Sequence, residues 1–152
     1  MKNTFNDVLM AERVESLKAA IIGSLSLLLA FVLTELLNNL VLREYFKLPN
    51  NYQILSVNWQ TLLSGGIAGA SGLLFGVTYR YIVRADNNPQ LKAGGVMAFG
   101  LVRGLAQVDV GISCNNSVLP VIVQAGESIL WFGLGAIALD VAMQWGWVKS
   151  FK

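Results

Sequence analysis

The sequence predicts an all-α integral membrane protein, a bundle of four transmembrane helices with a short N-terminal interfacial helix. Hydrophobic residues make up 55% of its 152 residues and charged residues only 13%, whereas soluble domains carry about 25% charged residues. Mean hydropathy is +0.57. Long stretches with little or no charge recur along the chain, and a helix needs about 20 mostly apolar residues to cross the hydrocarbon core. Residues 1–152 are therefore expected to form a single membrane domain.

The chain begins with an interfacial segment and continues into its strongest span. Phe5, Val8 and Leu9 recur at helical spacing in a charged stretch, which predicts a short helix at the membrane surface; a frayed tail is the alternative. Residues 19–42 form the first span, because Glu35 is the only charged residue among them. Acidic residues precede this apolar run, and it is longer than the core of a secretory signal.

Two further spans follow from the same pattern. Residues 59–83 form the second span, most of which lies in a stretch without any charged residue, from Leu48 to Tyr79. Residues 118–141 form the last span and carry Glu127 in their first half. Their length and uniform apolar character favour membrane spans over the buried helices of a soluble domain.

The third span, residues 93–112, is weaker because Arg103 and Asp109 lie within it. Loop charge supports it. With four spans, lysines and arginines divide eight to two between the two sides of the membrane, but without this span they divide six to four. The positive-inside rule then places both termini in the cytoplasm or the stroma. The eight residues are Lys2, Arg13, Lys18, Arg80, Arg84, Lys92, Lys149 and Lys152, and the two are Arg43 and Lys47.

Glycines recur on one stripe of the second span, spaced four, three and four residues apart, and a glycine pair repeats this spacing on the third span. Without Cβ atoms, such stripes let another helix approach closely. Packing within the bundle is the leading interpretation. A surface for a partner subunit and a slot for a flat pigment or carotenoid are the alternatives. The stripes are Gly65, Gly69, Gly72 and Gly76 on the second span, and Gly100 and Gly104 on the third.

Charged side chains inside the predicted spans include Glu35, Arg103, Asp109 and Glu127. A charge at the centre of a membrane helix costs about 2.5–3.5 kcal/mol, so such residues face the protein interior or water. They fit a structural pair, a pathway for protons, ions or polar substrates, or contact with a partner. Arg103 and Glu127 lie at equal depth, about 14 Å from the same interface. This predicts an ion pair between them, with Glu35 as the second candidate partner.

The sequence lacks the residues of common catalytic and metal sites. It contains no histidine and one cysteine, Cys114, so zinc, haem and iron–sulfur sites lack their usual ligands and histidine acid–base catalysis is excluded. A net charge of +2 does not indicate nucleic-acid binding. We therefore expect no enzyme, no metal site and no catalytic residue, while chlorophyll, a carotenoid or a lipid stays open as a bound group.

Several motifs lie between residues 78 and 132: TYRY at 78–81, NPQLK at 88–92, AFGLVRGLA at 98–106 and GESILWF at 126–132. With them the chain resembles a family of small thylakoid membrane proteins of cyanobacteria and plant plastids. The resemblance implies a thylakoid-type membrane and a link to photosynthetic complexes. It implies no functional residue, because the motifs carry no known chemical role.

Together these observations predict a non-enzymatic accessory, structural or assembly subunit associated with a photosynthetic membrane complex. The expected partners are the lipid bilayer and other membrane protein subunits, such as those of a photosystem. The alternative is a small oligomeric transporter or channel that uses the intramembrane charges Glu35, Arg103 and Glu127.

Overall fold

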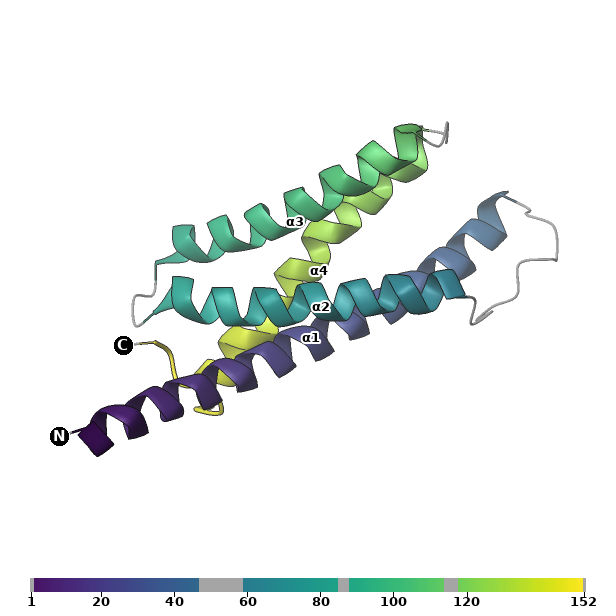
Figure 1. Cartoon of the computed structure of the whole chain (residues 1–152). Helices are drawn as coiled ribbons and strands as arrows, with labels where there is room; N and C mark the ends of the chain where they lie inside the picture. Colours follow the sequence, from purple (N-terminus) through teal and green to yellow (C-terminus); the bar gives the residue numbers. More distant parts are fainter. Residues whose placement is uncertain (1, 47–58, 85–87, 114–117, 152) are drawn as a thin grey trace.

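The computed structural model describes residues 2–46, 59–84, 88–113 and 118–151 of the chain (Figure 1). These residues form four helices, which confirms the all-α class. The helices α1, α2 and α4 contain segments long and apolar enough to cross a membrane. The second predicted span has the bounds of α2. The helices are α1 (Lys2–Phe46), α2 (Trp59–Val83), α3 (Pro89–Ser113) and α4 (Val118–Gln144).

Helix α1 is one continuous helix of 45 residues. At 1.5 Å per residue it is about 68 Å long, roughly twice the thickness of the hydrocarbon core. The prediction of a short N-terminal helix is thus wrong in one respect. Residues 2–18 are helical, but they are the first turns of α1 and not a helix of their own. No glycine or proline precedes Gly23, so nothing in the local sequence ends one helix and starts another.

The helices form two pairs. Helix α1 packs closely on α2 and α3 packs closely on α4, whereas α2 and α3 contact each other much less. Figure 1 shows the four helices running along one general direction, with the two chain termini, the end of α2 and the start of α3 at one end of the bundle. The opposite end holds the last turns of α1 and α3 and the first turns of α2 and α4.

Glycines set the distance within each pair. A Cβ atom on Gly72 would lie 2.6 Å from the carbonyl oxygen of Gly23 on α1, and one on Gly100 would lie 2.8 Å from the Cα of Ile129 on α4. Real Cβ atoms do not approach other atoms this closely, so only glycine permits these crossings. Both predicted glycine stripes therefore include residues packed against helices of the same chain.

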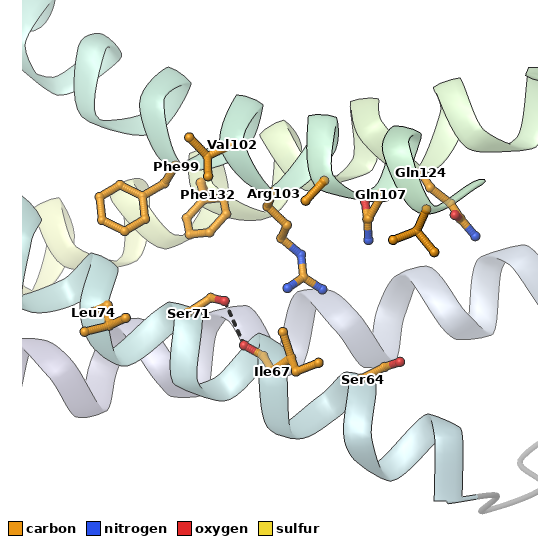
Figure 2. A pocket seen from close by; sticks show the side chains of 12 residues that line it. Ser64, Ile67, Ser71, Leu74, Phe99, Val102, Arg103, Gln107, Gln124 and Phe132 are labelled. Atoms are coloured by element: carbon orange, nitrogen blue, oxygen red, sulfur yellow. Dashed lines mark hydrogen bonds between the residues drawn. The ribbon is translucent and has the colours of Figure 1, made fainter. Parts of the chain in front are cut away.

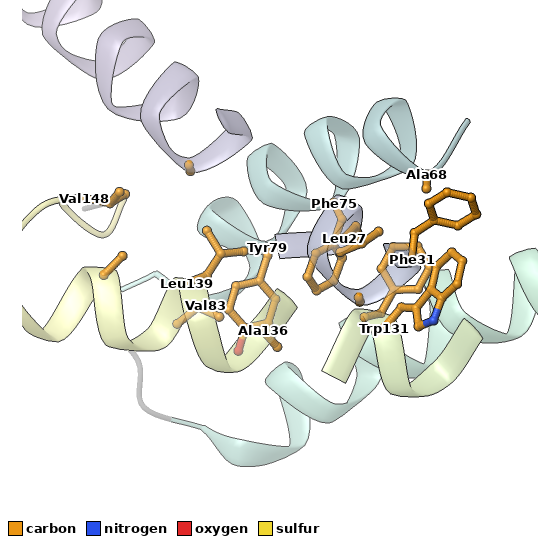
Figure 3. Close-up of a cluster of buried hydrophobic side chains, with 14 residues drawn as sticks. Leu27, Phe31, Ala68, Phe75, Tyr79, Val83, Trp131, Ala136, Leu139 and Val148 are labelled. Atoms are coloured by element: carbon orange, nitrogen blue, oxygen red, sulfur yellow. The ribbon is translucent and has the colours of Figure 1, made fainter. Parts of the chain in front are cut away.

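The apolar core is small and lies where α1, α2 and α4 meet (Figure 3). Its centre is the ring of Phe75, which lies 5.1 Å from that of Phe132 and 5.4 Å from that of Phe99, centroid to centroid. Many large apolar side chains lie outside it, among them Leu74, which is 66% exposed. A surface this apolar suits helices surrounded by lipid rather than by water.

Candidate functional site

A cleft of about 630 Å³ lies between α2 and α3 and reaches α4 (Figure 2). It exists because each helix is held by a different neighbour, α2 by α1 and α3 by α4, which leaves these two helices in loose contact. The cleft is open at its side, since the lining residues Leu74 and Val102 are 66% and 72% exposed. In a bilayer, such an opening faces the lipid.

The two ends of the cleft differ in chemistry. Leu74, Phe99 and Phe132 line one end, and the amides of Gln107 and Gln124 lie toward the other (Figure 2). The hydroxyl of Ser128 donates a hydrogen bond of 2.8 Å to the side-chain oxygen of Gln107. This bond leaves the NH₂ group of Gln107 as the free donor. The cleft is therefore apolar at one end and rich in hydrogen-bond donors at the other.

Arg103 lies between these two ends and extends from α3 toward α2 (Figure 2). Its Nε atom is buried and has no hydrogen-bond partner in the described part of the chain, and its Cζ lies 4.8 Å from the centroid of the Trp131 ring. Contact with an aromatic face offsets up to about 2 kcal/mol of the cost of a desolvated cation. Among the described residues no carboxylate forms an ion pair with Arg103.

The predicted ion pair between Arg103 and Glu127 is accordingly not formed. The prediction rests on the equal depth of the two residues in the membrane. Whether two side chains meet also depends on their direction, which changes by about 100° from one residue of a helix to the next. Ala125 and Ile129 are the α4 residues that meet the α3 glycines, and Glu127 lies far round the helix from both of them. Glu127 is half-buried and does not line the cleft.

The other predicted intramembrane charges do not join Arg103 either. Glu35 on α1 and Asp109 on α3 are exposed, and neither lines the cleft. Over the described ranges, no group of three histidine, cysteine or acidic residues has the arrangement of a metal site. The structure therefore places only Arg103 of these four side chains in the cleft.

A buried arginine at the end of the bundle was missed as a site residue. Arg80 on α2 is 0% exposed. Its Nε donates a 2.8 Å hydrogen bond to the carbonyl oxygen of Lys149, one Nη donates a 2.7 Å hydrogen bond to the hydroxyl of Ser16, and the other Nη pairs with the carboxylate of Glu12. Arg80 thus ties α1, α2 and the C-terminal tail together. Arg80 lies in the motif at 78–81, which could have singled it out. From the sequence alone it counts only as one of the positive charges near the membrane surface.

A second polar cluster lies on the same end and joins the other helices. The carboxylate of Asp140 on α4 accepts a 3.2 Å hydrogen bond from the hydroxyl of Tyr79 on α2. Its other oxygen lies 2.9 Å from the Nζ of Lys92 on α3. Each charged group in the two clusters has a partner of opposite charge, so both act as structural ties rather than as binding sites.

The chain matches no protein family, no curated protein and no solved structure. The resemblance to thylakoid membrane proteins therefore stays a prediction from the sequence motifs.

Proposed function

We propose that this chain is a non-enzymatic accessory or assembly protein of a thylakoid-type photosynthetic membrane, which acts by holding a membrane-embedded component in the α2–α3 cleft. The cleft carries the proposal, because it is open to the lipid and presents an arginine without an ion-pair partner among the described residues. Its lining offers guanidinium, amide, hydroxyl and apolar groups, but no carboxylate, thiol or amine. Such groups bind and orient a ligand, whereas general acid–base catalysis needs a group that titrates near neutral pH.

The proposal includes four membrane spans, with both termini on the cytoplasmic or stromal side. Helix α3 has 25 residues, about 37 Å, which is enough to cross. Two of its polar residues, Arg103 and Gln107, are half-buried at the cleft, and the exposed Asp109 lies only four residues before the end of α3, near the membrane surface. The uneven distribution of loop charge supports the same orientation. The thylakoid location is supported by the motifs at 78–81, 88–92 and 98–106.

The alternative of an oligomeric transporter or channel has less support. It was motivated by Glu35, Arg103 and Glu127 acting together. Of these three, only Arg103 lines the cleft. A pathway for ions or polar substrates needs polar groups along one continuous route, which these three side chains do not provide.

Native gels test the proposed function. Tagged protein extracted gently from its native membrane is expected to migrate with a larger photosynthetic complex, whose subunits mass spectrometry would identify. Because the component held in the cleft links the chain to the complex in this proposal, Val102→Trp, which fills the cleft, is expected to release most of the protein from the complex. Leu101→Trp is the matched control, because Leu101 is exposed on α3 but does not line the cleft. Migration of the wild type only as a free protein would contradict the proposal.

A further inference from the structure

We propose that the component held in the α2–α3 cleft is an anionic membrane lipid, with its charged head on Arg103 and an acyl chain along the apolar end. This assignment rests on the proposed function and names the ligand class of the same site. Two features of the cleft carry it: an unsatisfied cation, and a change from donor-rich to apolar lining along its length (Figure 2).

The charge of Arg103 requires an anion. A guanidinium is charged at any physiological pH, so burial cannot neutralise it by loss of a proton. The Trp131 ring covers one face of Arg103 but accepts no hydrogen bond at the buried Nε. The planar guanidinium matches phosphate, sulfonate and carboxylate oxygens, which accept two parallel N–H bonds. The side chains of Gln107 and Gln124 line the polar end of the same cleft (Figure 2), and their amide groups offer further donors to such a head.

The position of the polar end fits a lipid that enters from one leaflet. Gln124 is the seventh residue of α4 and Ser64 is the sixth of α2, so both lie about 8–9 Å from those helix starts. Arg103 is ten residues before the end of α3, about 15 Å from the same end of the bundle. A head group on Arg103 would thus lie near the middle of the hydrocarbon core, far below its usual level at the interface. Its chain would continue toward Leu74, Phe99 and Phe132.

The size of the cleft favours a lipid over a partner helix. A helix is about 10–12 Å across with its side chains. A volume of about 630 Å³ would enclose roughly 6–8 Å of such a cylinder, which is one to one and a half turns. A transmembrane helix crossing the whole bilayer is several times longer. The cleft instead has the volume of a small-molecule site, which is about 300–1,000 Å³.

Native mass spectrometry of the full chain from mixed micelles tests this assignment. The probes are phosphatidylglycerol and phosphatidylcholine in equal amounts, which differ in net charge but share their acyl chains. The wild type is expected to retain one phosphatidylglycerol with at least about tenfold preference, the gain of one charge-assisted hydrogen-bond pair. Arg103→Gln is expected to abolish the preference, and Val102→Trp is expected to abolish retention.

Arg84→Gln is the matched control, because it removes the same charge from an exposed position outside the cleft. It is expected to keep the preference. Arg103→Lys covers the case in which Arg103→Gln does not fold, and is expected to keep a weaker preference because the charge stays. Equal retention of the two lipids by the wild type would overturn the assignment, as would a full preference in Arg103→Gln. A photo-crosslinker at Val102 that captures a polypeptide instead of a lipid would also overturn it.

The two proposals fail separately. If the wild type migrates with a photosynthetic complex but shows no lipid preference, the lipid assignment falls and the accessory role stands. If the wild type migrates alone but selects phosphatidylglycerol, the accessory role falls and the lipid assignment stands.

Discussion

At the scale of single residues, Arg80 and Arg103 differ in role because they differ in their hydrogen-bond partners. Arg80 is fully buried, yet oxygen atoms from α1 and the C-terminal tail accept its hydrogen bonds. Arg103 is half-buried, and none of the described residues accepts a hydrogen bond from its Nε. The first arrangement stabilises the folded state, because buried charge is compensated. The second leaves a cation that a ligand can satisfy, and this contrast separates a structural residue from a candidate binding residue.

Substitution of Arg80 tests its structural role. Arg80→Gln is expected to lower the free energy of unfolding by about 3 kcal/mol, because Glu12 and the carbonyl of Lys149 lose a charged partner. Glu12 is partly hydrated, with 34% of its side chain exposed, so the loss should stay near the lower end for a buried pair. Thermal unfolding in detergent, followed by tryptophan fluorescence, measures it. Arg84→Gln is the control, and equal melting midpoints of the two variants would contradict the role.

At the scale of helices, close packing determines which faces meet. The α1–α2 crossing is held at glycines, with Gly72 against Gly23 and Ser24. The α3–α4 crossing is held in the same way at Gly100 and Gly104. Because α2 packs closely on α1 and α3 packs closely on α4, α2 and α3 contact each other only loosely, and the cleft lies between them. The cleft is thus a consequence of how the helices pair.

A glycine pair on α2 tests this packing. Gly72→Ala is expected to lower the free energy of unfolding by about 1–3 kcal/mol, because the new Cβ would lie 2.7 Å from the Cα of Ser24 and backbone atoms cannot move aside cheaply. Gly66→Ala is the control on the same helix, since its Cβ would meet nothing within 4 Å. Comparison of accumulation in the membrane and of thermal midpoints measures the difference. Equal tolerance of both substitutions would mean that α1 and α2 do not cross at Gly72.

The C-terminal tail provides a second test at this scale. A stop codon after Gly146 removes Val148, which is 1% exposed, and the Lys149 carbonyl that accepts the Arg80 hydrogen bond. The truncation is expected to lower the melting midpoint by several degrees. Combined with Arg80→Gln it should cost less than the sum of the two separate losses, because both remove the same contact. Deletion of Lys152 alone is the control, and strictly additive losses would contradict the shared contact.

At the scale of the whole molecule, the helix directions support a four-span arrangement. Both termini, the end of α2 and the start of α3 lie at one end of the bundle. That end carries the Arg80 and Asp140 clusters, which join all four helices. Three helices have the length and composition of membrane spans. Whether α3 also crosses determines the side on which the C-terminus lies.

Cysteine labelling from one side of the membrane tests the topology. In a Cys114→Ser background, single cysteines replace Asn6, Asn88, Ser113 or Ser150. With four spans, a membrane-impermeant maleimide is expected to label Ser113→Cys from one side only and the other three from the opposite side. If α3 does not cross, Ser113→Cys would be labelled together with Asn88→Cys, and Ser150→Cys would be labelled from the other side.

The sequence by itself determined the helical class and the approximate extent of α2, α3 and α4. These properties follow from composition along the chain, because a membrane span is defined by length and hydropathy alone. It also predicted the depth of side chains in the membrane, and it singled out Arg103 and the glycine stripes. It misjudged the start of α1, where the change from charged to apolar residues marks a change of surroundings but not the end of a helix.

Only the tertiary structure decided which side chains meet. Depth in a bilayer is a one-dimensional property that can be counted along the chain, whereas contact also depends on the rotation of each helix about its axis. Close packing at Gly72 and Gly100 sets that rotation. In the described residues Glu127 forms no ion pair with Arg103, and Arg103 lies in the cleft between α2 and α3. The partners of Arg80 lie more than 60 residues away along the chain, and only folding brings such distant positions together.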